Sequence, residues 1–297
     1  MPEGDTIFRS ARTLDRALKG HTLVAFDTAY APLASVNDNT PLVGRMVERV
    51  ESRGKWLLIY FSGDLILITH MLMSGSWHLY RRGERWRRTR SHMRIVLSTA
   101  EYEAVAFDVP VARFHSERSL ERQTTIPKLG PDLLGTAFAT DEAILRIRAQ
   151  AEEEIANVLL NQQVIAGIGN VFKSEICFAC QIHPFRHVTS LSNDEVDCLL
   201  ESSRRLMRAN VSDGAGDGIV TYSGGRRTTG ASNPSARLFV YGRQGRPCRR
   251  CGSAILMRKQ GSGARSTYWC PICQPMADAD RVLEGWSNSI RRRKIGC

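Results

Sequence analysis

The first apolar pattern in the chain has helical spacing and starts near the N-terminus. Four apolar residues fall on one face: Ile7, Ala11, Leu14 and Leu18. Gly20 follows, and glycine commonly ends helices. The pattern therefore predicts a helix that begins close to residue 3 and holds the N-terminal residues in a folded element.

Short runs rich in β-forming residues occupy the chain from Thr22 to about Asp108. The clearest are Trp56–Phe61, Leu65–Thr69, Arg94–Ser98 and Glu103–Phe107. Turn residues such as Gly63 separate them. Several short strands at this spacing predict a sandwich or a barrel.

The pattern changes near residues 124–137, where Pro127, Gly130, Pro131 and Gly135 indicate a linker. Helical periodicity follows over residues 141–149, 152–162, 170–180 and 194–209. Residues 212–237 are rich in Gly, Ser and Thr and predict a mobile loop. The expected division is a β-domain over 1–123, a linker, a helical domain over 138–237, a cysteine module over 238–275 and a basic tail over 276–297.

Charge adds the first functional indication. The chain has 41 Lys and Arg against 30 Asp and Glu, a formal charge of +11. This excess favours a polyanionic partner, with nucleic acid ahead of an anionic membrane, although solubility charge alone would also explain it.

Nothing in the sequence indicates membrane insertion or export. No stretch approaches the ~18 consecutive apolar residues of a membrane span. Glu3 and Asp5 interrupt any N-terminal signal region. We expect a protein of the cytoplasm with no membrane partner, and a reducing compartment fits the cysteine spacing better than disulfides do.

Four of the eight cysteines form two matched knuckles, Cys248-x2-Cys251 and Cys270-x2-Cys273, separated by 18 residues. This spacing predicts one tetrahedral Zn²⁺ ion, and four thiolates leave no ligand position open for catalysis. Cys177 and Cys180, with His183 nearby, form a weaker pair. Two buried residues on one helix face explain that pair better than a second metal.

Four other features have a functional and an ordinary interpretation. The turn from Gln162 to Asn170 contains two glycines and precedes a helix, where free backbone N–H groups can bind phosphate. Taken alone, the turn is explained better as a tight connection between two helices. Asn170 is expected to begin that helix as its capping residue.

The N-terminus and two early turns form the remaining candidates. Methionine before proline is normally removed, so Pro2 becomes a free secondary amine, with Glu3 beside it for proton transfer. Lys55 follows a glycine at the edge of a predicted strand. In His70–Gly75, Met73 serves either as core or as a wedge that fills the gap left by a flipped base.

Together and in this order, these motifs resemble the formamidopyrimidine-DNA glycosylase and endonuclease VIII family, in its endonuclease VIII-like branch. The similarity extends to about Gln274. It rests on Pro2-Glu3-Gly4, Arg53-Gly54-Lys55, His70–Gly75, Gln162–Asn170 with Lys173-Ser174-Glu175, Tyr241-Gly242-Arg243, and the cysteine knuckles through Gln274.

The resemblance implies an α+β fold: an N-terminal two-layer β-sandwich with an N-terminal helix, then a helix-two-turn-helix domain with a zinc-finger β-hairpin. It implies a DNA glycosylase that removes oxidised bases and cuts the strand by β,δ-elimination. The implied catalytic residues are Pro2, Glu3, Lys55 and Arg265. The implied DNA contacts are Lys55, Met73, Arg113, Asn170 and Arg265.

Three departures from the family pattern stand out, and the last two affect specificity. Asp5 replaces a proline found in many relatives, and Ala112 stands where a relative has arginine, in a segment expected to form a second gap-filling loop. In residues 223–230 two arginines interrupt the Gly-Thr-Thr segment with which purine-specific members cover the flipped base. We therefore expect oxidised pyrimidines to be preferred.

Three alternatives stay open: an oxidised-purine glycosylase, a non-catalytic protein that binds damaged DNA, and a zinc-ribbon RNA or ribosome factor. The last does not explain Pro2-Glu3. The expected partner is damaged double-stranded DNA, with single-stranded or bubble DNA as a further substrate. The protein is expected to act as a monomer associated with the bacterial nucleoid through DNA.

Overall fold

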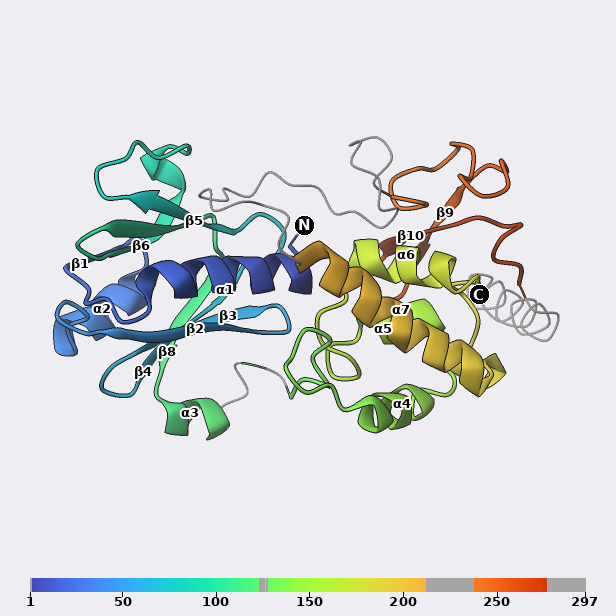
Figure 1. Cartoon of the computed structure of the whole chain (residues 1–297), viewed down its shortest axis with the longest axis horizontal. Helices are drawn as coiled ribbons and strands as arrows, with labels where there is room; N and C mark the ends of the chain where they lie inside the picture. Colours follow the sequence, from blue (N-terminus) through green and yellow to red (C-terminus); the bar gives the residue numbers. More distant parts are fainter. Residues whose placement is uncertain (1, 123–125, 127, 212–237, 277–297) are drawn as a thin grey trace, which may run out of the picture. The chain divides into compact units, whose positions relative to one another are not determined.

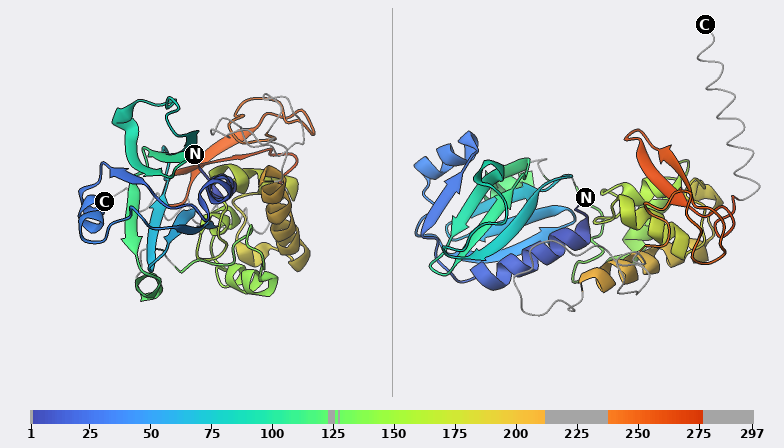
Figure 2. Two further views of the ribbon diagram at one scale, coloured as in Figure 1. Left: turned by 60° about the vertical axis from the view of Figure 1, so that its left-hand side comes forward. Right: turned by 90° about the horizontal axis from the view of Figure 1, so that it is seen from above.

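The structure is a computed structural model that describes residues 2–122, 126, 128–211 and 238–276. The described residues form two compact units (Figures 1 and 2). The first consists mainly of residues 2–135, and the second of residues 136–210 together with the cysteine module. Within the described part of the chain, no helix is both long and apolar enough to cross a membrane.

Helix α1 (Gly4–Leu18) confirms the predicted N-terminal helix. All four apolar residues of the predicted face are at most 3% exposed. Gly20 adopts a φ of 79°, a left-handed conformation that glycine accommodates without steric cost. Burial of this face against both sheets holds the N-terminus in place.

The β-region forms the predicted two-layer sandwich of two four-stranded antiparallel sheets (Figure 1). One sheet has the order β1 (Ala25–Thr28), β6 (Met93–Ser98), β7 (Tyr102–Phe107) and β5 (Ser76–Arg81). The other has the order β2 (Val47–Arg53), β3 (Trp56–Phe61), β4 (Leu65–His70) and β8 (Val111–His115).

The main core lies between the sheets, and α1 contributes to it. Each sheet also has an apolar outer face. On the β3–β4 sheet, Leu58, Tyr60 and Ile66 pack with Leu120 from α3 (Glu117–Arg122). On the other sheet, Phe107 and its neighbours pack with Trp86. Strands buried on both faces read as nearly continuous apolar runs, which explains the composition of β3 and β4.

One helix lies inside the region that the sequence predicts as β-structure alone. Helix α2 (Ala31–Asn39) follows β1 and has a proline in its first turn. Proline suits a helix start because its fixed φ is helical and its missing N–H would have no helical partner. Leu33 is the buried residue of this helix, too short an apolar pattern to predict it.

The second unit contains the four predicted helices. They are α4 (Thr140–Arg148), α5 (Ile155–Leu160), α6 (Asn170–Ala179) and α7 (Asn193–Val211). This unit also has a short 3₁₀ turn at Val188–Ser190, and the first unit has one at Arg90–His92. Helix α5 is shorter than predicted. Glu154 pairs as a β-bridge with His187, and the Ile155 N–H donates to Arg186 O, so the preceding residues cannot be helical.

Strands β9 (Leu256–Gln260) and β10 (Arg265–Trp269) form the hairpin of the cysteine module. Its small core includes Ile255, Cys270 and Phe178 from α6. The module is therefore packed against the helix that starts at Asn170. The predicted loop over 212–237 and the predicted tail from 277 onward lie outside the described residues, as does Met1.

Candidate nucleic-acid and catalytic site

Pro2 directly precedes α1, and the first residues of that helix are buried. The Glu3 main-chain carbonyl accepts hydrogen bonds from the N–H groups of Thr6, at 2.9 Å, and Ile7, at 3.1 Å. The side chains of Glu3 and Asp5 are both 0% exposed, whereas Pro2 is half-buried. The sequence thus places a half-buried proline beside a buried carboxylate, at the start of a helix that the core fixes.

Lys55 lies in the two-residue turn between β2 and β3. Gly54 has a φ of 57°, and its N–H donates to Asp132 Oδ2 at 2.7 Å. Glycine with positive φ at the first turn position is typical of tight hairpins. Asp132 is half-buried, and its partial removal from solvent raises the pKa of its carboxyl group. The turn that presents Lys55 is therefore tied to residue 132 of the predicted linker.

Lys55 lies close enough to His70, at the end of β4, to influence its ionisation. Burial and then the positive charge of Lys55 lower the pKa of His70 to about 4. His70 Nδ1 accepts a hydrogen bond from the Leu72 N–H at 3.1 Å. A neutral imidazole with its proton on Nε2 provides this acceptor. Neutral His70 therefore stabilises the turn that follows it.

The turn Met71–Gly75 divides its apolar side chains between core and surface. Met71 is 1% exposed, whereas Leu72 and Met73 are 49% and 61% exposed. A Cβ on Gly75 would lie 2.7 Å from Met71 O and 3.0 Å from Val109 Cα, which no side chain permits. The turn therefore presents two flexible apolar side chains on a tightly packed backbone.

The segment predicted as a second gap-filling loop is a strand, and that expectation is corrected here. Residues Val111–His115 form β8, which pairs with β4 along its length. Phe114 packs against Phe26, with ring centroids 6.0 Å apart, and belongs to the margin of the core. Arg113 is exposed and lies opposite Ile68. Cross-strand pairing decided this, because short alternating segments do not show their partner in sequence.

In the second unit, Gln162 organises the glycine turn before α6. Its Nε2 donates to the carbonyls of Leu160, at 2.8 Å, and Ile168, at 2.9 Å, and its Oε1 accepts from the Gly167 N–H at 3.0 Å. Gly167 adopts a φ of 112°, which strongly favours glycine. One side chain thus satisfies three backbone groups and fixes the turn.

Asn170 is the first residue of α6, and the capping position belongs to Gly169, which corrects the predicted cap. Asn170 is 7% exposed, and its Nδ2 donates to Ser266 O at 3.0 Å. No described residue donates a hydrogen bond to Asn170 Oδ1. This contact places Asn170 against the residue that follows Arg265.

Two buried charged residues of α6 support this arrangement, although the sequence motif alone gave them no role. Lys173 is 0% exposed and donates to Thr267 Oγ1 at 2.7 Å. Glu175 accepts three hydrogen bonds at 2.9 Å from the N–H groups of Phe239, Val240 and Tyr241. A charged residue on a buried helix face is the sequence signal that could have revealed them.

The hairpin places Arg265 at its exposed end. Arg265 is the first residue of β10 and lies opposite Gln260. Gln260 Nε2 donates to Glu154 Oε2 at 2.7 Å, which joins the hairpin to the residue before α5. Arg258 stacks on the Phe185 ring at 3.8 Å. These contacts fix the hairpin backbone on the helices while Arg265 stays accessible.

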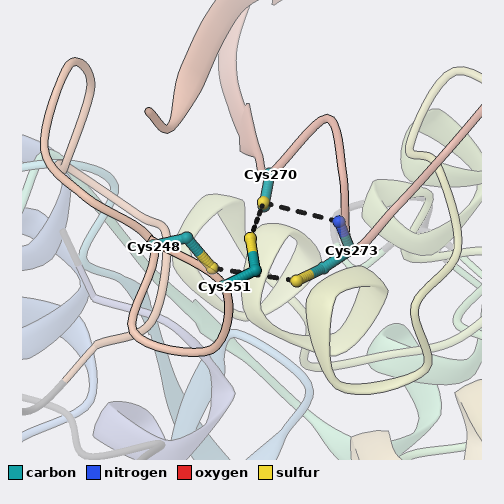
Figure 3. Close-up of side chains that lie close together, drawn as sticks. All are labelled: Cys248, Cys251, Cys270 and Cys273. Carbon is teal, nitrogen blue, oxygen red and sulfur yellow. Dashed lines mark hydrogen bonds between the residues drawn. The ribbon is translucent and has the colours of Figure 1, made fainter. Parts of the chain in front are cut away.

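The four knuckle cysteines converge as the spacing predicts (Figure 3). All four sulfur atoms lie within 4.8 Å of one another. Cys248 and Cys273 are 3.9 Å apart between sulfurs, and Cys251 and Cys270 are 3.4 Å apart. The Cys273 N–H also points at Cys270 Sγ, at 3.5 Å. This is a group of the kind that can hold a metal ion.

The other helical cysteines do not form a second metal site among the described residues. Cys177 is buried in α6. Cys180, by contrast, forms a disulfide with Cys198 of α7, with a Cα–Cα distance of 5.9 Å. The expectation of two buried cysteines on one helix face without a disulfide is wrong for Cys180, because its partner comes from another helix 18 positions away.

The predicted site residues fall into two groups. The first unit contains Pro2, Glu3, Lys55, Met73 and Arg113, and the second contains Asn170, Arg265 and the four cysteines. Within the first unit, Lys55 is near His70, which holds the turn of Met73. Within the second, Asn170 meets the β10 strand of Arg265.

Comparison with known proteins gives consistent relationships over most of the chain. Residues 1–121 match the model of the formamidopyrimidine-DNA glycosylase N-terminal domain, and residues 129–221 match that of its H2TH domain. The chain is 40% identical over 277 residues to a probable endonuclease 8 2 of Streptomyces coelicolor, covering 92% of this chain and 94% of the relative. It is 35% identical to a DNA-(apurinic or apyrimidinic site) lyase Nei2 of Mycolicibacterium smegmatis, with 92% and 99% covered.

Solved structures agree on the fold. The Lactococcus lactis Fpg bound to DNA with an abasic site matches with a TM-score of 0.75 and 24% identity, over 93% of this chain and all of that one. Two models of the same family match consecutive parts of the chain. Relatives of 35–40% identity match it over nearly their full length, and together these matches establish the family. The chain belongs to the formamidopyrimidine-DNA glycosylase and endonuclease VIII family, a family of DNA glycosylases of base excision repair.

Proposed function

We propose that the chain is a bifunctional DNA glycosylase and abasic-site lyase in which Pro2 is the nucleophile. The observation that carries this proposal is the N-terminus itself. Pro2 stays half-buried and accessible, while Glu3 beside it is 0% exposed on a helix fixed by the core. A buried carboxylate next to an amine suits proton transfer during nucleophilic attack.

The chemistry follows from a secondary amine. Once Met1 is removed, the Pro2 nitrogen attacks C1′ of the damaged nucleotide, the bond from C1′ to the base breaks, and the base leaves with a proton. The nitrogen lone pair then expels O4′, which takes up a proton as the sugar ring opens, and an iminium ion forms between the nitrogen and C1′. The iminium acidifies C2′, so the C2′–H electron pair forms a double bond and the 3′ phosphate leaves. A second elimination releases the 5′ phosphate.

Glu3 is the proton donor and acceptor in this scheme. Lys55, Asn170 and Arg265 hold the phosphates of the extruded nucleotide, because such contacts fix position without reading sequence. Met73 fills the gap in the stack, supported by its 61% exposure on a tightly packed turn. Arg113, exposed on β8, contacts DNA beside that gap.

The cysteine group holds one structural Zn²⁺ in this proposal. Four sulfurs within 4.8 Å of one another suit tetrahedral coordination by thiolates. The ion supplies no step of the reaction. Its ligands Cys270 and Cys273 directly follow β10, which ends at Trp269. The metal would therefore hold the end of the strand that starts at Arg265.

Oxidised pyrimidines are the proposed preferred lesions. Relatives named endonuclease 8 2 share 34–40% identity with this chain, against 29–31% for relatives named formamidopyrimidine-DNA glycosylase and 28% for an endonuclease 8 of Pectobacterium atrosepticum. The covering segment over 223–230 lies outside the described residues. Excision from matched duplexes carrying thymine glycol, dihydrouracil or 8-oxoguanine tests the preference. Faster removal of 8-oxoguanine opposite cytosine would assign the purine alternative.

The partner is damaged double-stranded DNA, or single-stranded or bubble DNA, bound by a monomer in the bacterial cytoplasm. The bound state of solved relatives supports a DNA partner: the Lactococcus lactis Fpg structures contain abasic-site and damaged DNA. Activity on matched single-stranded, bubble and duplex substrates separates the three.

Borohydride trapping on an abasic-site duplex tests the proposed chemistry. The processed protein should form a covalent adduct, whereas protein with a verified N-terminal extension should bind the same duplex without an adduct. An adduct from the extended protein would move the nucleophile away from Pro2. Retained lesion binding with no adduct from either protein would identify a non-catalytic protein that binds damaged DNA.

A further inference from the structure

An arginine-rich segment joins β5 to β6 on the outer face of the first unit. We call residues 81–92 the arginine loop. It contains six arginines and one acidic residue, Glu84; the arginines are Arg81, Arg82, Arg85, Arg87, Arg88 and Arg90. None of them belongs to the site proposed above.

Strands β5 and β6 both run antiparallel to β7, so the arginine loop must return along the length of the sheet to connect them. Arg81 lies opposite Tyr102, at the start of β7. His92, at the other end of the loop, accepts through its carbonyl a hydrogen bond from the Asp108 N–H, just after β7. Six strand residues at about 3.3 Å each make this path about 20 Å long. Figure 1 shows the loop on the side of the sheet away from α1.

The end of the loop lies beside the turn that presents Met73. Asp108 receives a hydrogen bond from Arg88 Nη1 at 2.5 Å and also contacts His92. The next residue, Val109, packs so closely against Gly75 that a Cβ there would be 3.0 Å from its Cα. The C-terminal end of the arginine loop therefore lies next to the proposed gap-filling turn, and the rest of the loop leads away from it.

Buried anchors hold the loop backbone. The Trp86 ring packs on Phe107 with centroids 5.7 Å apart, and its Nε1 donates to Glu103 Oε2 at 3.1 Å. The Arg87 N–H donates to Tyr80 Oη at 3.1 Å, and the Arg82 N–H to Glu101 O at 2.8 Å. Because the backbone is already ordered, binding through its side chains costs little backbone entropy.

The positive charge of the loop lies at the protein surface. All six arginines are exposed. Glu84, the loop's acidic residue, accepts a hydrogen bond from the Arg81 N–H, a local contact with the backbone. Arg88 and Arg90 pair with Asp108 and Asp27 respectively. The loop thus carries six guanidinium groups against one carboxylate of its own.

We propose that the arginine loop binds the phosphate backbone of the duplex arm that extends away from the lesion. Guanidinium groups bind phosphate oxygens with paired hydrogen bonds, and they do so independently of sequence. Each strand carries one phosphate per about 3.4 Å of helix axis, so a path of about 20 Å parallel to the axis matches the rise of about six phosphates. The proposal rests on the proposed function, because it extends the same DNA complex beyond the damaged nucleotide.

The test compares the double variant Arg85→Gln/Arg87→Gln with the intact protein on two duplexes. Both duplexes carry a stable abasic-site analogue. The long duplex extends well beyond the lesion on both sides, whereas the short duplex ends close to the lesion on both sides. Arg118→Gln is the matched control, because Arg118 is also exposed in the first unit but lies on α3 over the other sheet. Thermal unfolding verifies that all variants are folded.

On the long duplex, the double variant should bind about tenfold more weakly, with a salt slope less steep by about 1 to 2 units, since each phosphate contact contributes about 0.9. On the short duplex it should bind like the intact protein. Arg118→Gln should match the intact protein on both. Equal affinity and slope on the long duplex, or equal losses on both duplexes, would overturn the proposal. A loss confined to single-stranded DNA would also overturn it.

Failure of the proposed function gives a different result. In that case the intact protein itself fails to form a borohydride adduct at saturating abasic DNA. If only the arginine loop is misassigned, the intact protein is trapped and the double variant binds the long duplex unchanged. If both proposals hold, saturating DNA restores full trapping of the double variant.

Discussion

At the scale of single residues, the burial of Glu3 separates two steps of the proposed reaction. Its side chain is 0% exposed beside the half-buried Pro2. Removing a base requires a proton for the leaving group, whereas a pre-formed abasic site has already lost its base. Glu3 should therefore matter more for the first step than for the second.

Glu3→Gln should lower base excision by about 100-fold or more, the usual contribution of a positioned acid or base. Trapping on a pre-formed abasic site should fall much less. Single-turnover excision and borohydride trapping of the same preparation measure the two steps. Equal losses in both would show that Glu3 acts on nucleophilic attack or on the N-terminal structure instead.

Another residue-scale consequence concerns pH. His78 is 8% exposed, with its ring nitrogens 3.0 Å from Ser76 Oγ and from Tyr80 Oη. Burial, and then Arg88 and Arg87, lower its pKa from 6.5 to about 4. Between these values the unfolded chain binds more protons than the folded one. The stability that His78 contributes is thus complete above pH 6.5 and is lost as pH falls toward about 4.

We expect His78→Gln to flatten this dependence. The unfolding temperature of the intact protein should fall between about pH 6.5 and 4, where an ordinary imidazole gains its proton. That of the variant should start lower and fall less over the same interval. Calorimetry or circular dichroism across this range measures both curves. Parallel curves would show that other groups, such as His70 and the carboxylates, account for the whole dependence.

At the scale of elements, the β9–β10 hairpin depends on contacts at both of its ends. Asn170 and Lys173 of α6 reach Ser266 and Thr267 on β10. The cysteine group closes the other end, where Gln274 Oε1 accepts from the Cys270 N–H at 3.0 Å. An exposed Arg265 keeps a defined position only while both ends hold.

Metal removal should therefore loosen the hairpin while leaving the β-sandwich folded. Purified protein should contain one zinc per chain, and a chelator or Cys273→Ser should weaken DNA binding, because metal binding and local folding are coupled. Metal analysis with anisotropy titration tests this, and the melting of the first unit is the internal control. Active protein without metal would contradict the zinc assignment.

At the scale of the whole molecule, the formal charge of +11 should act mainly through phosphate contacts. Affinity for abasic duplex should fall steeply with salt, with a logarithmic slope steeper than about −2, since each phosphate contact releases counterions worth about 0.9. Titrations at several salt concentrations measure the slope. A flat response would mean that the charge is not part of the binding surface.

The sequence by itself determined the elements whose signal is local. Apolar spacing predicted α1, whose four marked residues are all buried, and turn residues separated β3 from β4. Cysteine spacing predicted the group of four that converges within 4.8 Å. Helix periodicity, tight turns and metal knuckles involve residues that are close in the chain, so their pattern is legible without a fold.

Only the tertiary structure decided which distant segments meet. It placed Val111–His115 in a strand against β4, joined Cys180 to Cys198, and buried Lys173 against Thr267. It also folded the arginine loop back along β7, so that a run of exposed charges ends beside Gly75. Partners far apart in sequence leave no local periodicity, because packing and hydrogen bonding select them only when the chain closes on itself.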